Sequence, residues 1–136
     1  MKKPYAILAI ALAAVSFQAA AAEPKEEKTA SGIVITKIKE GTGASPKSTD
    51  TVKVHYRGTL VNGKEFDSSY GRGQPAIFSL NRVIPCWTEG MQTMKTGGKS
   101  KLVCPPELAY GSRGFPGAVP PDATLIFEVE LLDIAR

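Results

Sequence analysis

"IPCWTEGMQTMKTGG", residues 84–98, spaces its apolar residues as a helix does, within a sequence whose apolar residues otherwise alternate as in strands. Trp87, Met91 and Met94 recur at spacings of four and three, which places them on one face of a helix. Pro85 suits the first helical position, where a backbone N–H is not needed, and Gly97 suits the helix end. This stretch predicts one short helix, about ten residues long, with an inward apolar stripe.

The segments on both sides of this helix are predicted to be strands. Val52, Val54 and Tyr56 share one strand face, and the pair Asn62 and Gly63 is typical of a tight hairpin. The strands are expected within residues 32–43, 51–69, 99–104 and 123–134. They predict an α+β fold in which the helix covers part of the apolar face of an antiparallel sheet and leaves the rest open as a pocket.

The start of the chain differs in character from the rest of its 136 residues. Residues 1–22 open with Lys2 and Lys3 and continue through a short apolar run to small residues, which predicts a signal peptide cleaved before Glu23. Residues 23–31 are polar and without periodicity, which predicts a flexible polar arm. Residues 32–136 form the expected domain, long enough for one core.

Charge and composition exclude several kinds of partner. Of the 17 basic residues, Lys2 and Lys3 lie in the signal, so the remaining 15 against 13 acidic residues leave a formal charge of +2. Because these residues are scattered, no nucleic-acid partner is expected, and no membrane association is expected after signal cleavage. His55 is the single histidine, on a polar strand face, so the sequence indicates neither a metal site nor a cofactor.

Five aromatic side chains near the ends of the expected elements carry the remaining chemical signal: Tyr56, Phe66, Trp87, Tyr110 and Phe127. Each taken alone could be a core residue, because aromatic rings contribute heavily to protein cores. Residues 111–121 add an irregular segment, rich in Gly and Pro, that is longer than most connections in compact domains.

Five segments in this order resemble the FKBP-type peptidyl-prolyl cis-trans isomerases, the macrolide-binding immunophilins. They are VKVHYRGTL (52–60), GKEFDSS (63–69), VIPCWTEGMQTMKTGGKSKL (83–102), PPELAYG (105–111) and PGAVPPDATLIFEVELL (116–132). The resemblance covers nearly all of residues 32–136, and the signal peptide makes the chain similar to exported bacterial members. It implies an antiparallel half-barrel sheet wrapped around one short helix, and a rotamase that assists the folding of exported proteins in the periplasm or outside the cell.

The resemblance also implies a site, in which Trp87 forms the floor of a pocket for a proline ring. The implied catalytic residues are Tyr56, Asp67, Ile84, Trp87 and Tyr110, and the implied substrate-binding residues are Phe66, Val83, Ala109, Phe115, Val119 and Phe127. Residues 111–121 become a flap over this pocket. The implied partners are Xaa-Pro segments of unfolded proteins and macrolide inhibitors. We expect a monomer, because only residues 23–31 precede the domain.

Two questions stay open on the sequence alone. The alternative function is a weakly catalytic chaperone or binding module for proline-containing segments, favoured by Ala76 and Phe115, where relatives often carry an aromatic residue and a histidine. Arg82 also stands where an acidic residue is common. Cys86 and Cys104 could either form a disulfide or remain two buried thiols. A disulfide is plausible because a helix followed by a returning strand brings the second cysteine back to nearly the level of the first along the helix axis.

Overall fold

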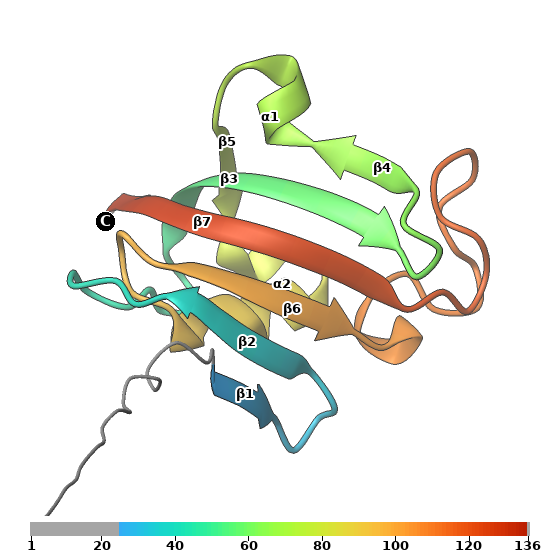
Figure 1. Cartoon of the computed structure of the whole chain (residues 1–136), viewed down its shortest axis with the longest axis horizontal. Helices are drawn as coiled ribbons and strands as arrows, with labels where there is room; N and C mark the ends of the chain where they lie inside the picture. The colour runs from blue at the N-terminus through green and yellow to red at the C-terminus, as the bar shows by residue number, and fades with distance from the viewer. Residues whose placement is uncertain (1–24, 136) are drawn as a thin grey trace, which may run out of the picture.

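The computed structural model describes residues 25–135, which form a seven-stranded antiparallel sheet with one short helix, α2, against its face (Figure 1). The expected fold class is confirmed. The predicted signal peptide, residues 1–22, lies outside the described residues. Among residues 25–135 we find no helix long and apolar enough to cross a membrane.

The strands pair in the order β1-β2-β6-β7-β3-β4, and β5 pairs with β3 as well. Their bounds are β1 Lys25–Lys28, β2 Val34–Lys39, β3 Thr51–Leu60, β4 Glu65–Ser68, β5 Ala76–Ser79, β6 Lys99–Cys104 and β7 Leu125–Ala135. One edge of β3 is shared, since β5 lies opposite residues 51–54 and β4 lies opposite residues 57–59. The chain between β4 and β5 therefore stays beside this edge of β3, and it carries Arg72, which contacts residues of the candidate site.

The helices are short and connect the strands. They are α1 Ser69–Arg72, η2 Leu80–Arg82, α2 Pro85–Gly90, η3 Met91–Thr93 and η4 Pro106–Leu108. Pro85 is the first residue of α2, as expected. The expectation that Gly97 ends the helix is wrong, because α2 passes into the 3-10 turn η3, which ends at Thr93, and Gly97 lies in the turn before β6 with a φ of +89°.

The expectation of a flexible arm is wrong for residues 25–28. They form β1, which pairs antiparallel with β2 from Lys25 opposite Lys37 to Lys28 opposite Val34. Main-chain hydrogen bonds to a neighbouring strand can hold such a strand whatever its side chains are. A prediction that counts only apolar side chains therefore misses it. The turn that follows is tied by the Thr29 N–H, which donates to the Ile33 carbonyl at 2.8 Å.

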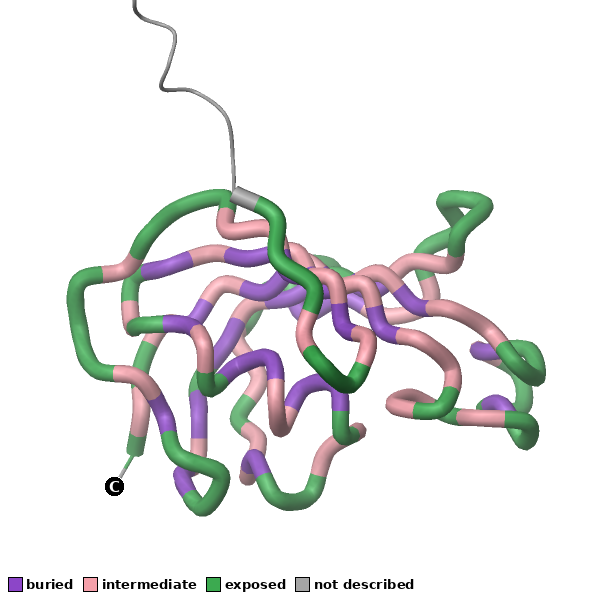
Figure 2. Tube along the Cα trace, turned by 90° about the horizontal axis from the view of Figure 1, so that it is seen from below, coloured by how far each residue is buried: buried purple, intermediate pink, exposed green. Residues whose placement is uncertain are grey.

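The core lies between the sheet and α2, where the buried stretches gather in Figure 2. Alternate residues of β3 and β7 point into it, as the strand periodicity predicts. Trp87, Met91 and Met94 are all buried, so the predicted apolar stripe does face inward. The buried set from the two central strands is Val52, Val54, Tyr56, Leu125, Phe127, Val129 and Leu131.

Candidate functional site

A cavity of about 430 Å³ opens on the face of the sheet that α2 leaves uncovered. Its lining comes from β3, β4, β5, β7, α2, η2 and the loop after η4, so residues far apart in sequence meet there. The lining residues are Tyr56, Phe66, Asp67, Phe78, Arg82, Val83, Ile84, Trp87, Tyr110 and Phe127. Eight of the eleven residues that the sequence singled out for the site lie on this wall.

Trp87 is the central ring of the cavity. It projects from α2 and is only 4% exposed, and three other rings meet it edge-on. Its ring centroid lies 5.0 Å from Tyr56, 5.2 Å from Phe78 and 5.3 Å from Phe127. Edge-to-face contacts of this kind favour one fixed ring orientation, so the floor of the cavity is rigid and apolar.

Gly58 of β3 allows two rings to pack at one side of the cavity. A Cβ atom at this position would lie 2.7 Å from Phe66 Cζ and 2.8 Å from Phe127 Cε1. Both distances are shorter than the contacts that real Cβ atoms make, so a side chain here would force the rings to move. Without it, the two rings pack edge-on with centroids 5.6 Å apart. The glycine is therefore required by close approach, and the Phe66 and Phe127 wall depends on it.

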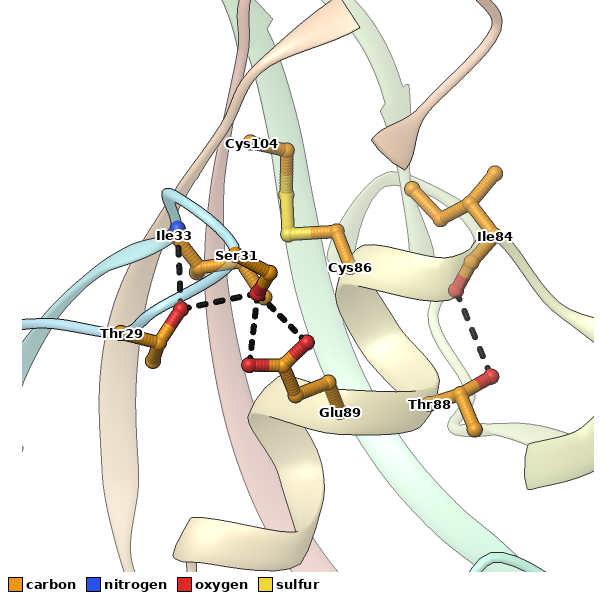
Figure 3. Close-up of a disulfide and its surroundings, with 8 residues drawn as sticks. All are labelled: Thr29, Ser31, Ile33, Ile84, Cys86, Thr88, Glu89 and Cys104. Atoms are coloured by element: carbon orange, nitrogen blue, oxygen red, sulfur yellow. Dashed lines mark hydrogen bonds between the residues drawn. A yellow bond between two sulfur atoms is a disulfide. The ribbon is translucent and has the colours of Figure 1, made fainter. Parts of the chain in front are cut away.

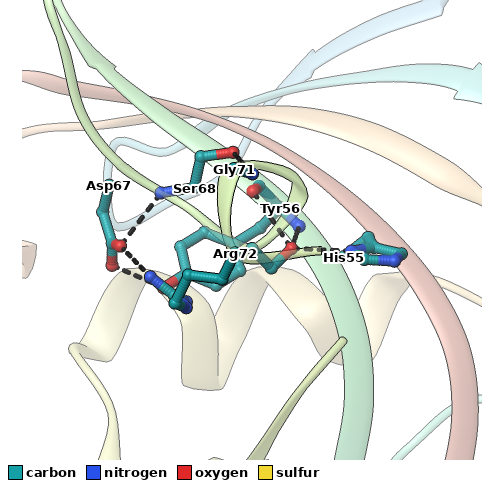
Figure 4. Close-up of polar contacts among 7 residues, drawn as sticks. His55, Tyr56, Asp67, Ser68, Gly71 and Arg72 are labelled. Carbon is teal, nitrogen blue, oxygen red and sulfur yellow. Dashed lines mark hydrogen bonds and ion pairs between the residues drawn. The ribbon is translucent and has the colours of Figure 1, made fainter. Parts of the chain in front are cut away.

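A polar network around Asp67 forms part of the cavity rim (Figure 4). The Tyr56 hydroxyl donates to the Asp67 carboxylate. Arg72, at the end of α1, donates from Nη1 to Asp67 Oδ1 at 2.7 Å and from Nη2 to the Tyr56 hydroxyl oxygen at 3.1 Å. The Ser68 N–H also donates to Asp67 Oδ1, at 2.9 Å. The Asp67 carboxylate is thus held by three donors.

This network sets the protonation of its members. Burial alone would raise the pKa of Asp67, but the hydrogen bonds from Tyr56 and Arg72 outweigh it and lower that pKa below its ordinary value. Burial, followed by the hydrogen bond to Asp67, raises the pKa of Tyr56. Asp67 is therefore a carboxylate and Tyr56 a neutral phenol at neutral pH, and neither is poised as a general acid or base.

The turn that carries Arg72 is fixed to β3 by a second set of contacts. The Ser68 hydroxyl accepts from the Gly71 N–H at 3.2 Å and caps α1. The buried Ser69 hydroxyl accepts from the Tyr56 N–H at 2.7 Å and lies 2.8 Å from Nδ1 of His55. His55 thus packs at the polar face, as expected, and helps to hold α1 where Arg72 reaches Asp67.

The Ile84 N–H and the Tyr110 hydroxyl are donors at the cavity that no hydrogen bond among residues 25–135 uses. The Ile84 N–H, at the N-cap of α2, takes part in none of the backbone hydrogen bonds found among residues 25–135. The Tyr110 hydroxyl likewise makes none of the side-chain hydrogen bonds found within that range. Burial, followed by the charge of Asp67, raises the pKa of Tyr110, so its hydroxyl keeps its proton at neutral pH.

Three expected site residues lie away from the cavity wall. Ala109 packs against the core, and Val119 is buried within the 111–121 loop, where it exchanges two backbone hydrogen bonds of 2.8 Å with Phe115. Phe115 is 55% exposed and stacks on Tyr110 with ring centroids 5.5 Å apart. The loop is thus a folded structure beside the cavity mouth, and it contacts the cavity through Tyr110.

Sequence reasoning missed Phe78 and Arg72, and it noted Arg82 only as a departure from relatives. Phe78 lies on β5, a four-residue strand whose alternation of inward Ala76 and Phe78 with exposed Ile77 is short but readable. Arg72 gave no signal, because only the folded turn brings it to Asp67.

Known proteins resemble this chain in sequence. The sequence profile of the FKBP-type peptidyl-prolyl cis-trans isomerases matches residues 43–132, which include every residue of the cavity. The chain belongs to this family. FkpA of Escherichia coli K12, an FKBP-type peptidyl-prolyl cis-trans isomerase, is 57% identical over 114 residues, which are 83% of this chain and 42% of that protein. The present chain thus spans less than half the length of that relative.

Solved structures agree with the assignment to the FKBP family. The crystal structure of Escherichia coli FkpA superposes with a TM-score of 0.78 at 54% identity, over 80% of this chain and 51% of that one. A peptidyl-prolyl cis-trans isomerase from Pseudomonas syringae pv. tomato superposes with a TM-score of 0.78 at 40% identity, over 85% and 84% of the two chains.

In this FKBP domain, a disulfide and a hydrogen-bonded loop tie α2 to the sheet beneath it (Figure 3). Cys86 and Cys104 are bonded, with Cα atoms 5.7 Å apart, so the structure selects one of the two alternatives left open by the sequence. On the next turn of α2, the Ser31 hydroxyl lies 2.6 and 2.7 Å from the two carboxylate oxygens of Glu89. The helix that carries Trp87 is thus held from two sides.

Proposed function

We propose that this protein is a peptidyl-prolyl cis-trans isomerase that binds the proline of Xaa-Pro segments in the aromatic cavity and accelerates rotation about the preceding peptide bond. The observation that carries the proposal is the cavity itself, whose rigid floor at Trp87 is flanked by rings and faced by two unused donors. Family membership supports the same activity.

The reaction needs no nucleophile, which agrees with the protonation states in the cavity. Resonance opposes rotation about a peptide bond with a barrier of about 18 to 20 kcal/mol, and uncatalysed Xaa-Pro bonds isomerise over tens to hundreds of seconds. Each reduction of about 1.4 kcal/mol in that barrier raises the rate tenfold. The planar amide is more charge-separated than the twisted one, so an apolar cavity that excludes water disfavours the ground state more than the transition state.

The unused donors position the substrate in this proposal. The Ile84 N–H binds one substrate carbonyl and the Tyr110 hydroxyl binds the neighbouring one, so the proline ring lies over Trp87 while the bond turns. The Tyr56, Asp67 and Arg72 network keeps the rim in place. Phe115 and the rest of the 111–121 loop contact residues beside the proline.

The first experiment follows cis-to-trans relaxation of a short Xaa-Pro peptide, with and without an excess of a macrolide inhibitor. We expect the protein to accelerate relaxation and the macrolide to abolish the acceleration. A folded protein that binds the peptide without accelerating relaxation would contradict the proposal and support the alternative, a chaperone or binding module for proline-containing segments.

A paired tyrosine substitution tests the donor role. Tyr110→Phe removes one hydrogen bond to substrate, so turnover should fall by about two- to tenfold with the fold intact. Tyr70→Phe is the matched control, because Tyr70 lies on α1 outside the cavity and its hydroxyl donates to Glu130. An unchanged rate for Tyr110→Phe would remove its hydroxyl from the mechanism.

We further propose that the protein works in the periplasm or outside the cell, on exported proteins that are still folding. The disulfide supports this location, because such bonds persist in oxidising compartments. The signal-peptide pattern of residues 1–22 points the same way. Labelling of free thiols in the protein extracted without reductant should find none, and two labelled thiols would contradict the oxidising location.

A further inference from the structure

Arg82 is the charged residue of the cavity that the mechanism above leaves unused. It is the last residue of η2, two positions before Ile84, and it lines the same cavity as Trp87. Its side chain is exposed to solvent. An arginine at the wall of an otherwise aromatic site presents a planar group with five hydrogen-bond donors to whatever the site holds.

The charges around the cavity leave Arg82 without a carboxylate of its own. Asp67 is the other charged residue of the lining, and Arg72 and Tyr56 already bind it. The ion pairs found among residues 25–135 join Lys37 to Glu40, Arg57 to Glu65, Arg72 to Asp67 and Lys99 to Glu128. None of them includes Arg82, so its guanidinium group is available to a ligand.

We propose that Arg82 makes this cavity select proline-containing segments that carry a carboxylate, from Asp or Glu, in the residue next to the proline. The proposal rests on the proposed function, because the proline ring over Trp87 sets where the neighbouring side chains lie. A guanidinium group matches the geometry of a carboxylate with two parallel hydrogen bonds. A lysine next to the proline would instead meet a like charge.

The size of the preference follows from the exposure of Arg82. Solvent-exposed ion pairs contribute little to binding, so an acidic neighbour should improve binding by about 1.4- to fivefold over a neutral one. The same exposure makes the preference sensitive to salt, because ions screen charges that water can reach. Binding of a peptide with a neutral neighbour should change little with salt.

The test uses peptides that differ only in one residue beside the proline, with Glu, Gln or Lys placed before it in one series and after it in another. Trp87 is the single tryptophan of the chain, so quenching or enhancement of its fluorescence reports binding directly. Cis-to-trans relaxation of the same peptides gives the turnover. In at least one series we expect the Glu peptide to bind best and the Lys peptide worst.

Variants assign the preference to Arg82. Arg82→Gln should bring the ratio of Glu to Gln peptide affinities to one, and Arg82→Glu should favour the Lys peptide. Lys64→Gln is the matched control, because it removes one positive charge from the exposed turn between β3 and β4, outside the cavity lining, and should leave the ratio as in the wild type.

Two outcomes overturn the inference: equal affinities for the Glu and Gln peptides in both series, or a Glu preference that persists in Arg82→Gln. Failure of the proposed function has a different signature, namely binding of peptides without acceleration of their isomerisation. In that case the fluorescence ratios still decide the role of Arg82. If no peptide binds at all, both proposals are wrong.

Discussion

Opening the disulfide between Cys86 and Cys104 should lower the stability of the fold by about 3 kcal/mol. The two residues are 18 apart in sequence, and closing a loop of that length removes a corresponding conformational entropy from the unfolded chain. Both side chains are fully buried, and the reduced thiols still fill the same space, so reduction creates no cavity. A loss of this size is a large fraction of the 5 to 15 kcal/mol that typically stabilises a domain, on the order of a third.

Urea unfolding of the oxidised and the fully reduced protein measures this loss. With a slope of about 1 to 3 kcal/mol per molar urea, the midpoint should fall by about 1 to 3 M on reduction. Because the thiols are buried, the reduced form is prepared by unfolding in reductant and refolding in its presence. The double variant Cys86→Ala/Cys104→Ala is the control, since its midpoint should not respond to reductant. Coincident midpoints for oxidised and reduced wild type, with two labelled thiols in the reduced sample, would refute the reasoning.

Three further perturbations test the site and its supports. Gly58→Ala places a methyl group against the two phenylalanines that pack over this strand position, so it should cost about 1 to 3 kcal/mol in urea unfolding and weaken peptide binding; full stability would mean that the wall can yield. Because hydrogen bonds lower the pKa of Asp67 in the folded state, its carboxylate stabilises the fold above the ordinary Asp pKa and this contribution is lost as the pH falls through the folded-state value. The stability advantage of wild type over Asp67→Asn should therefore shrink as the pH falls below about 4, and a constant difference would contradict the assigned hydrogen bonds. Ser31→Ala removes the hydroxyl that binds Glu89 and should lower the unfolding free energy by about 1 kcal/mol, whereas no change would show that the exposed contact is replaced by water.

Side-chain periodicity was sufficient to locate the strands that bury one face. In β3, and in β7 as far as Leu131, every second residue is buried, and both strands were predicted near their observed positions because burial of that face stabilises them. β1 has no such face, since its residues Lys25–Lys28 are all charged and main-chain hydrogen bonds to β2 hold it. Period-based reasoning cannot find a strand of this kind.

Apolar periodicity also determines which residues of the site could be predicted from the sequence. The rings of Tyr56, Trp87 and Phe127 are on faces that the period assigns to the interior, and the family resemblance then identified them as one pocket. Arg72 reaches Asp67 only because a capped four-residue helix turns the chain back over β3. A contact of that kind depends on turn geometry, which no apolar pattern encodes.

Pairing also determines what the charged residues near the cavity can do. In sequence Arg72 and Arg82 look alike, each an arginine in a short polar connection. In the fold Arg72 is committed to Asp67, where it fixes the rim, while Arg82 lines the cavity with no ion pair among residues 25–135. The charge that a substrate meets is therefore positive, although the lining contains one residue of each sign. If that difference governs selection, exchanging the residue at position 82 should alter which proline segments bind, and altering Arg72 should instead loosen the rim for all of them.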